Sequence, residues 1–219
     1  MRYLVRIARV SMLVVVCLVG SLVRADAATS PVLAPTSGWE ITVYYTAVER
    51  FHSGPPVPVT GCPIQDCERG TTPLGRYPAD FVQAVQDEGT GRITSGPHAG
   101  RYLNWSEGTG YWLDTLPADA RGQRLLPWRS AAVDGVVAPF GASVRVLGCG
   151  TDSQSTEAID PRVCAQLRRA SWVIRDRFTS GLGGPRHVDL YIGEEDRRGF
   201  AASSPKVIDT STARVLLRR

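Results

Sequence analysis

The sequence of 219 residues contains no uninterrupted apolar run of about 18 residues, the length that a membrane-spanning helix needs. This excludes a protein built from several membrane spans. Hydrophobic residues nevertheless make up 43% of the chain and charged residues 21%, which supplies a core and excludes wholesale disorder. The 22 glycines and 15 prolines indicate many turns, and they favour a β-rich chain over a helical bundle.

The common catalytic signatures are also missing. There is no G-x-S-x-G, no H-E-x-x-H and no P-loop, and the segment 181–186 fails the G-x-G-x-x-G pattern at its last position. The three histidines, His52, His98 and His187, stand in separate segments without metal-ligand spacing, which favours surface or structural roles. We expect neither a metal nor a cofactor, so carboxylates are the remaining candidates for chemistry.

The positive charge is concentrated at the start of the chain. The formal net charge is +4, but four of the 25 basic residues and only one of the 21 acidic ones lie within residues 1–27. The rest of the chain therefore carries a net charge of +1. Its arginines are scattered among acids, which argues against a nucleic-acid partner.

Residues 1–27 have the three parts of a secretory signal peptide. Three arginines precede an apolar segment, 10–23, and Ala25-Asp26-Ala27 provides small residues for cleavage. As a helix this segment reaches about 21 Å, short of the roughly 30 Å of membrane hydrocarbon, which favours cleavage over an uncleaved anchor. A lipoprotein is disfavoured because Val16 precedes Cys17. We expect a mature chain from Ala28, secreted to the extracellular space or cell wall, with no membrane span after cleavage.

The predicted export also bears on the state of the cysteines. Removal of the leader leaves an even set: Cys62, Cys67, Cys149 and Cys164. In an oxidising compartment four cysteines indicate two disulfides with three connectivities, and sequence proximity favours Cys62–Cys67 and Cys149–Cys164. A zinc site is the alternative, but the spacing matches no usual zinc motif.

Strand patterns outnumber helix patterns along the chain. The prolines, glycines and paired cysteines of residues 52–76 predict a loop. Helices are predicted over 78–88 and from Asp160, as N-cap, to about 170. Strands are predicted over the following ranges: 41–48, a segment from 131 that ends before a turn at 138–141, 142–147, 172–177, 187–192 and 213–217. This pattern predicts a small β-barrel in one domain, 28–219.

The segment His187–Ile192 alternates in polarity. Its apolar residues, Val188, Leu190 and Ile192, share the face expected to point into the core, so that His187, Asp189 and Tyr191 share the other face. An acid between two apolar neighbours in a strand is either solvated on an outer face or held in a groove. The alternation by itself favours the solvated face.

Three aspartates stand in segments that resemble the blocks of the three-aspartate (3D) domain family. These segments are Ala-Ala-Val-Asp134-Gly, Val-Ile-Arg-Asp176 and His-Val-Asp189-Leu-Tyr, and the segment 43–47 is similar to the opening strand of the family. Two positions depart from the family pattern: Gly135 replaces a proline, and Arg177-Phe178 replaces Thr-Gly. The segment between Asp134 and Asp176 is longer, and residues 49–128 have no counterpart.

The resemblance implies a mainly β fold, a six-stranded double-psi β-barrel with short helices and a loop-rich insertion at 49–128. It is the barrel of membrane-bound lytic transglycosylase A-type enzymes and of stationary-phase relatives, which cut peptidoglycan between N-acetylmuramic acid and N-acetylglucosamine. By position Asp189 matches the acid that donates a proton and then acts as base, while Asp176 and Asp134 would tune it. For Asp134 a turn-capping role before Gly135 stays open.

A glycan also needs apolar faces on which to stack. The predicted substrate-binding residues are polar or aromatic and lie in the insertion or beside Asp189: Tyr102, Asn104, Trp105, Tyr111, Trp112, His187 and Tyr191. Ordinary packing is the competing role for those in the insertion. The resemblance thus predicts a secreted, monomeric enzyme acting on peptidoglycan or a related glycan. The alternatives are a non-catalytic, expansin-like glycan-binding module and a disulfide-stapled interaction protein.

Overall fold

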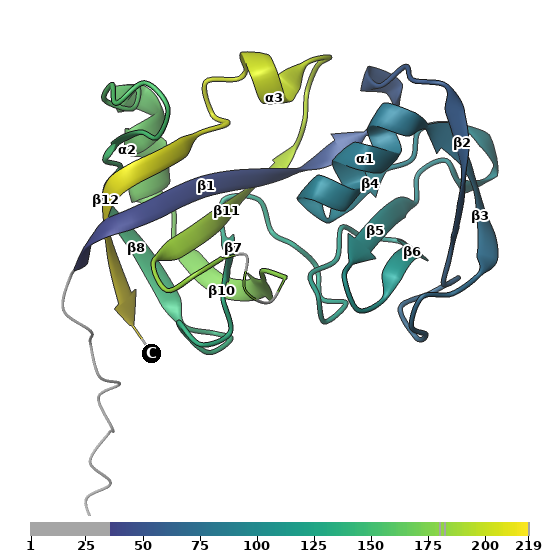
Figure 1. Cartoon of the computed structure of the whole chain (residues 1–219), viewed down its shortest axis with the longest axis horizontal. Coiled ribbons are helices and arrows are strands. Elements are labelled where there is room, and N and C mark those ends of the chain that lie inside the picture. The colour runs from purple at the N-terminus through teal and green to yellow at the C-terminus, as the bar shows by residue number, and fades with distance from the viewer. Residues whose placement is uncertain (1–35, 180, 182, 219) are drawn as a thin grey trace, which may run out of the picture.

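The computed structural model describes residues 36–218 apart from Ser180 and Leu182. The predicted signal peptide, residues 1–27, and the predicted mature start at Ala28 lie outside the described residues. Figure 1 shows two parts, a barrel on the left and the insertion with α1 on the right, joined by the long strand β1 (Thr36–Val48). Within the described residues no helix combines the length and the apolar character that crossing a membrane would require.

Six strands form the closed barrel. They are β1 and five others: β7 (Ser130–Val133), β8 (Ser143–Gly148), β10 (Trp172–Arg177), β11 (His187–Glu194) and β12 (Asp209–Arg218). Their order is β1-β11-β7-β10-β8-β12, and β12 pairs back with β1 to close the ring. The pairs β1–β11 and β7–β10 are parallel and the others antiparallel. The short strand β9 (Thr151–Asp152) extends along β12. The predicted fold, a mainly β double-psi barrel of six strands, is confirmed.

The barrel interior is filled by alternate residues of its strands. On β11, Val188, Leu190 and Ile192 are buried in the core, as their alternation predicts. The helix α2 (Pro161–Arg169) covers this core, and the predicted N-cap is present, since Asp160 Oδ1 accepts a hydrogen bond of 2.7 Å from Arg162 N. Satisfying this backbone donor helps the helix begin where the sequence predicts.

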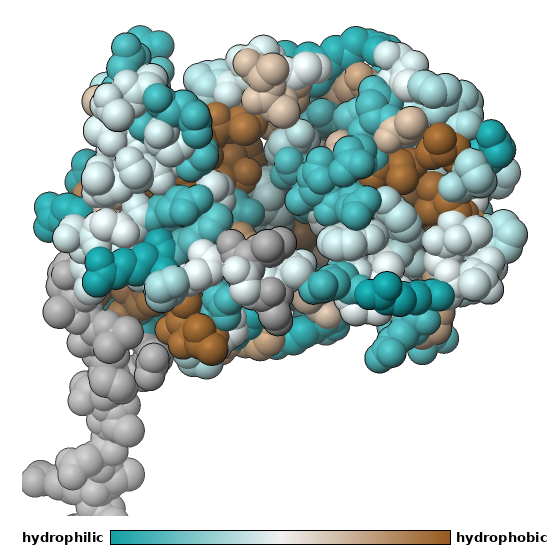
Figure 2. Space-filling model, in the orientation of Figure 1, coloured by the Kyte–Doolittle hydropathy of each residue, from teal (hydrophilic) through white to brown (hydrophobic). Residues whose placement is uncertain are grey.

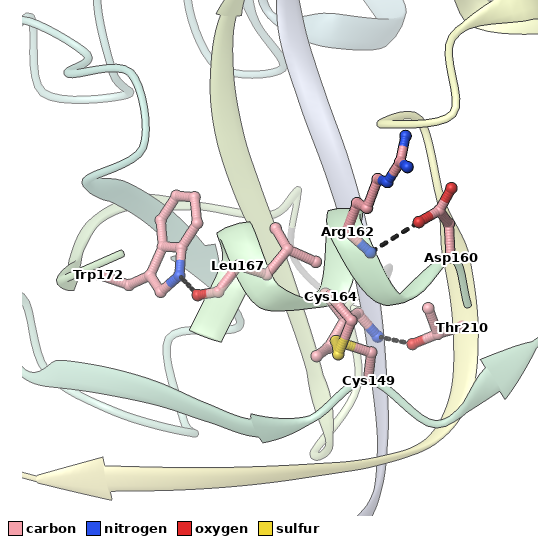
Figure 3. The surroundings of a disulfide bond; sticks show 8 residues. Cys149, Asp160, Arg162, Cys164, Leu167, Trp172 and Thr210 are labelled. Atoms are coloured by element: carbon pink, nitrogen blue, oxygen red, sulfur yellow. Dashed lines mark hydrogen bonds between the residues drawn. A yellow bond between two sulfur atoms is a disulfide. The ribbon is translucent and has the colours of Figure 1, made fainter. Parts of the chain in front are cut away.

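Both disulfides have the pairing that sequence proximity favours, Cys62–Cys67 and Cys149–Cys164. Figure 3 shows the second bridge beside α2, where it ties the end of β8 to the helix. Trp172, at the start of β10, donates a hydrogen bond of 2.9 Å to the Leu167 carbonyl at the other end of the same helix. Helix α2 is therefore fastened to the barrel at both ends.

The insertion contains more regular structure than the predicted loop-rich segment. Its elements are η1 (Glu49–Phe51), β2 (Pro56–Gly61), β3 (Thr72–Pro78), α1 (Ala79–Glu88), β4 (Thr90–Arg92), η2 (Gly96–His98), β5 (Tyr102–Ser106) and β6 (Gly110–Asp114). The prediction of a loop over 52–76 is wrong, because β2 and β3 pair there as an antiparallel hairpin. Prolines are tolerated in it because both strands of a two-stranded sheet are edges.

The insertion has its own apolar core and is joined to the barrel through β1. Leu74, Phe81 and Val85 are buried in that core, and Ala47 of β1 packs with them. The last two residues of β1 pair with β4, so one strand belongs to both parts. The short helix α3 (Phe200–Ser203) returns the chain after β11, and the Phe200 ring lies 5.0 Å from that of Tyr45 on β1.

Candidate active site

Two of the three predicted aspartates lie in one cross-strand row. Asp189 on β11 is opposite Thr42 of β1 on one side and Ala132 of β7 on the other. Asp176 on β10 is opposite the same Ala132. Residues that pair across a sheet project from the same face, so the two acids flank one small side chain. The charge of Asp176 accordingly reaches Asp189 and raises its pKa.

Asp176 is held by donors on both carboxylate oxygens. Its Oδ1 accepts from the backbone N–H groups of Ala120 (3.0 Å) and Arg177 (2.9 Å), and its Oδ2 accepts from the Tyr44 hydroxyl (3.3 Å). Burial, together with the nearby charge of Asp119, raises the pKa of Asp176 to about 6, although the three donors act in the opposite direction. Both oxygens of the Asp176 side chain thus accept hydrogen bonds, which hold the side chain in place.

Asp189 accepts a hydrogen bond from one side chain. Its Oδ1 accepts a hydrogen bond of 2.8 Å from the Thr42 hydroxyl, and no side chain among the described residues binds its Oδ2. Burial, together with the charges of Asp176 and Glu40, raises the pKa of Asp189 to about 7, although the Thr42 hydroxyl and the Leu190 N–H act in the opposite direction. A partly exposed carboxyl with this pKa can both give and take a proton near neutral pH.

Tyr44 connects the two acids. Burial, followed by the charges of Asp176 and Asp189, raises its pKa well above the usual range, so the phenol stays protonated and acts as a donor. Its ring packs against that of Tyr191 at 5.2 Å.

Asp134 caps a turn, and its charge, like that of Asp176, acts on Arg177. Its Oδ1 accepts from the Val136 N–H at 3.2 Å, and its carbonyl accepts from the Val137 N–H at 3.0 Å. No hydrogen bond within the described residues joins it to Asp176 or Asp189. The turn-capping role that the sequence left open is therefore the role that the contacts show.

Glu88 is a residue of the acid site that the sequence reasoning missed. It ends α1 in the insertion, and its Oε2 accepts from the Tyr45 N–H of β1 at 3.1 Å. Burial raises its pKa well above the usual range, and the charge of Asp189 is the next cause. One signal could have found it. An acid in the last turn of a helix opposes the helix dipole, and α1 has no basic residue there to compensate.

Two guanidinium groups stand beside Asp176. Arg177 and Arg121 both lie over the Phe140 ring, at 3.9 and 3.7 Å from its centroid. Arg177 also donates to the Ala138 carbonyl at 2.9 Å. Arg177 and Phe178 are the residues that depart from the pattern of the family that the sequence resembles.

Solved structures share this fold. E. coli MltA with bound chitohexaose, a lytic transglycosylase, is 12% identical, with 84% of this chain and 72% of that chain covered and a TM-score of 0.53. The membrane-bound lytic murein transglycosylase from Agrobacterium tumefaciens is 13% identical, with 84% and 75% covered and a TM-score of 0.47. The chain has a lytic-transglycosylase-like fold. No family model matches the sequence, and a search of curated proteins finds no match.

The predicted sugar-binding residues of the insertion divide into two groups. Trp112 and Asn104 have no exposed surface, and Asn104 bonds to the Leu116 carbonyl at 3.1 Å, so they are packing residues and cannot stack on a sugar. Tyr102 is partly exposed, with its hydroxyl on Glu194 at 3.1 Å. The remaining two, Trp105 and Tyr111, are partly buried against the insertion core.

The two candidates beside Asp189 also differ from expectation. Tyr191 is 1% exposed and bonds to Thr46, since a second layer of residues covers this face of β11. His187 lies 2.8 Å from the Thr42 hydroxyl. Neither is an open sugar platform.

Figure 2 shows hydrophilic side chains over the middle of one face, between the barrel and the insertion, with hydrophobic patches on both sides. Two hollows, of about 300 and 360 Å³, are lined by residues near the ends of β1 and β12, and neither includes the acids. The acid row is therefore identified by its chemistry rather than by an enclosed cavity.

Proposed function

We propose that this protein cleaves the glycan strands of peptidoglycan by a lytic transglycosylase reaction, with Asp189 as the proton donor. The observation that carries the proposal is the state of Asp189: a carboxyl with a pKa of about 7, one oxygen bound by Thr42, and a second acid next to it in the row. The barrel that bears this acid has the fold of MltA, which was crystallised with bound chitohexaose.

The reaction needs one carboxyl that acts twice. Asp189 gives its proton to the glycosidic oxygen as the bond from that oxygen to the anomeric carbon breaks. The resulting carboxylate takes the proton from the 6-hydroxyl of the same sugar while that oxygen attacks the anomeric carbon. The products are a 1,6-anhydro sugar and a free hydroxyl on the next sugar, and Asp189 regains its proton. No water is consumed and no nucleophilic carboxylate is required, unlike the two-carboxylate hydrolases.

Asp176 and Tyr44 support this proton transfer. The negative charge of Asp176 favours the protonated form of Asp189, because two neighbouring carboxylates resist simultaneous ionisation. Tyr44 keeps Asp176 in place. In this proposal the protein acts outside the cell or in the cell wall, where the two disulfides are stable.

A non-catalytic glycan-binding module is the second candidate. The cationic edge formed by Arg177 and Arg121 over Phe140, beside Asp176, favours it. Such an edge suits binding to an acidic glycan without contributing to bond cleavage.

Digestion of purified peptidoglycan decides between the two. The wild-type protein should release anhydro-muropeptides that mass spectrometry detects, and Asp189→Asn should release none while still sedimenting with insoluble peptidoglycan. Sedimentation without anhydro products from the wild type would support the binding module. Products with free reducing ends would indicate hydrolysis and contradict the proposed mechanism.

A further inference from the structure

A chain of hydrogen bonds runs from His187 through Thr42 to Asp189. The parallel pairing of β1 with β11 sets Thr42 opposite Asp189, with His187 two residues earlier on the same face. Thr42 Oγ1 lies 2.8 Å from His187 Nε2 and 2.8 Å from Asp189 Oδ1. Building on the proposed function, we propose that Thr42 and His187 are positioning residues, which hold Oδ1 of Asp189 so that Oδ2 serves the glycosidic oxygen.

When Asp189 is ionised, counting hydrogens fixes the direction of these hydrogen bonds. A threonine hydroxyl has one hydrogen and an ionised carboxylate has none, so Thr42 donates to Asp189. The Thr42 oxygen then accepts from His187, which requires the hydrogen on Nε2. When Asp189 carries its proton on Oδ2, Oδ1 is the carbonyl oxygen and accepts the same bond. The hydrogen bonds from His187 through Thr42 thus keep one arrangement while the proton leaves Oδ2 of Asp189 and returns to it.

The surroundings of His187 keep the ring in place and neutral. The ring packs against Phe178 with 4.5 Å between centroids, and 13% of the side chain is exposed. Burial lowers the pKa of His187, whereas the charges of Glu40 and Asp209 and the Gly183 carbonyl act against it. A neutral imidazole has one ring hydrogen, which in this proposal lies on Nε2 and goes to Thr42, so the bond to the Gly183 carbonyl belongs to the protonated ring that burial disfavours.

The groups around Asp189 predict how its titration responds. Asp176 and Glu40 raise its pKa through their charges, while the Thr42 hydroxyl and the Leu190 N–H lower it. Glu88 also faces Asp189, since the charge of Asp189 raises the pKa of Glu88. Removing the Thr42 hydroxyl deletes a donor that favours the carboxylate, and the pKa of Asp189 must therefore rise.

The first test compares Thr42→Val with Thr42→Ser. The valine variant should lower kcat about ten- to a hundredfold with little change in KM, because the acid is bound but misdirected. The alkaline limb of the pH–rate profile of this variant should move to higher pH by about one unit. The serine variant keeps the hydroxyl and should behave as the wild type. Thr46→Val is the matched control on the same strand, since Thr46 bonds to Tyr191 and not to Asp189.

A second pair of variants covers the case in which Thr42→Val fails to fold. His187→Gln retains an Nε2 donor for Thr42 and should keep most of the activity, whereas His187→Leu removes the donor and should lose it.

Carboxyl NMR titration of Asp189 provides a readout that needs no activity. Its pKa should be higher in Thr42→Val than in the wild type and unchanged in Thr46→Val. Equal titration in all three proteins would overturn the inference. If the wild type released no anhydro-muropeptides, the proposed function would fail. The NMR result would still decide whether the hydrogen bonds from Thr42 and His187 orient Asp189.

Discussion

At the scale of single residues, the number of donors around each acid separates the two aspartates. Asp176 receives three hydrogen bonds on two oxygens, whereas Asp189 receives one from the Thr42 hydroxyl, on Oδ1, beside the effect of the Leu190 N–H. An acid with donors on both oxygens holds its position and charge, and an acid with fewer donors can exchange a proton more readily.

Asparagine variants test this difference. Asp189→Asn should lose at least about a hundredfold in peptidoglycan cleavage with an intact fold, because the amide is nearly isosteric but cannot donate that proton. Asp176→Asn should lose less activity. It should also move the alkaline limb of the pH–rate profile to lower pH, since the charge that raises the pKa of Asp189 is gone. Rates over pH 5 to 9 and circular dichroism provide the check. Wild-type rates from Asp189→Asn would remove it from the mechanism.

Glu88 allows a separate test from the side of the insertion. Glu88→Gln keeps an acceptor for the Tyr45 N–H but cannot acquire the negative charge that Glu88 gains when it ionises, so the upper part of the alkaline limb of the pH–rate profile should move to lower pH, by up to about one unit for a strongly coupled pair. The control is Asp87→Asn on the same helix, which removes an exposed charge that solvent screens. A shift of equal size in both variants would contradict a specific role for Glu88.

Asp134 should behave as a turn residue. Asp134→Ala removes the acceptor for the Val136 N–H and should cost about 1 kcal/mol of stability, as the loss of a local side-chain cap does. Cleavage rates per folded molecule should stay near the wild-type value. A hundredfold loss of rate with unchanged stability would return Asp134 to the catalytic group.

At the scale of elements, β1 is the strand on which the site is built. Thr42 and Tyr44 bind the two acids, Tyr45 binds Glu88, and the end of the strand pairs with β4 of the insertion. A bulge between Tyr44 and Thr46 interrupts the pairing with β11 at this point, next to the Tyr45 N–H that Glu88 receives.

The two disulfides should contribute unequally to stability. Replacing Cys149 and Cys164 by serine opens a loop of 15 residues and should cost about 3 kcal/mol, while replacing Cys62 and Cys67 opens one of 5 residues and should cost about 2 kcal/mol. Urea unfolding of the two double variants measures both costs. A larger loss from the Cys62–Cys67 pair would show that strain or local structure outweighs chain entropy.

At the scale of the whole molecule, the acid site should make stability depend on pH. The folded protein raises the pKa values of Asp176, Asp189 and Glu88. Each group then binds its proton more tightly in the folded than in the unfolded chain, where an aspartate titrates near about 3.9. Their contribution is complete below that value and is lost as pH rises through about 6 and about 7, the folded values of the two aspartates.

Thermal unfolding from pH 4 to pH 8 checks this sign. The contribution of these acids to the Tm should fall between pH 4 and pH 8. Asp189→Asn cannot ionise at this position, so its Tm should rise relative to that of the wild type as pH rises. A difference between the two proteins that stays constant with pH would show that the folded pKa of Asp189 is not raised.

Local patterns were enough to predict several parts of the fold. The alternation of Val188, Leu190 and Ile192 placed β11 with its apolar face in the core, and Asp160 before Pro161 marked the start of α2. These features depend on neighbours within a few residues. The hairpin of β2 and β3 could not be predicted in this way, because prolines and glycines that usually mark loops are tolerated in edge strands.

The sequence alone determined which residue types were available: a β-rich chain, four cysteines after residue 27 and an aspartate on the polar face of a strand. Only the tertiary structure decided which of them act together. Asp176 and Asp189 meet because Ala132 pairs with both, and Glu88 joins them because α1 ends against β1. Their pKa values follow from burial and from charges on other strands. These causes depend on distance in space, which no local pattern encodes.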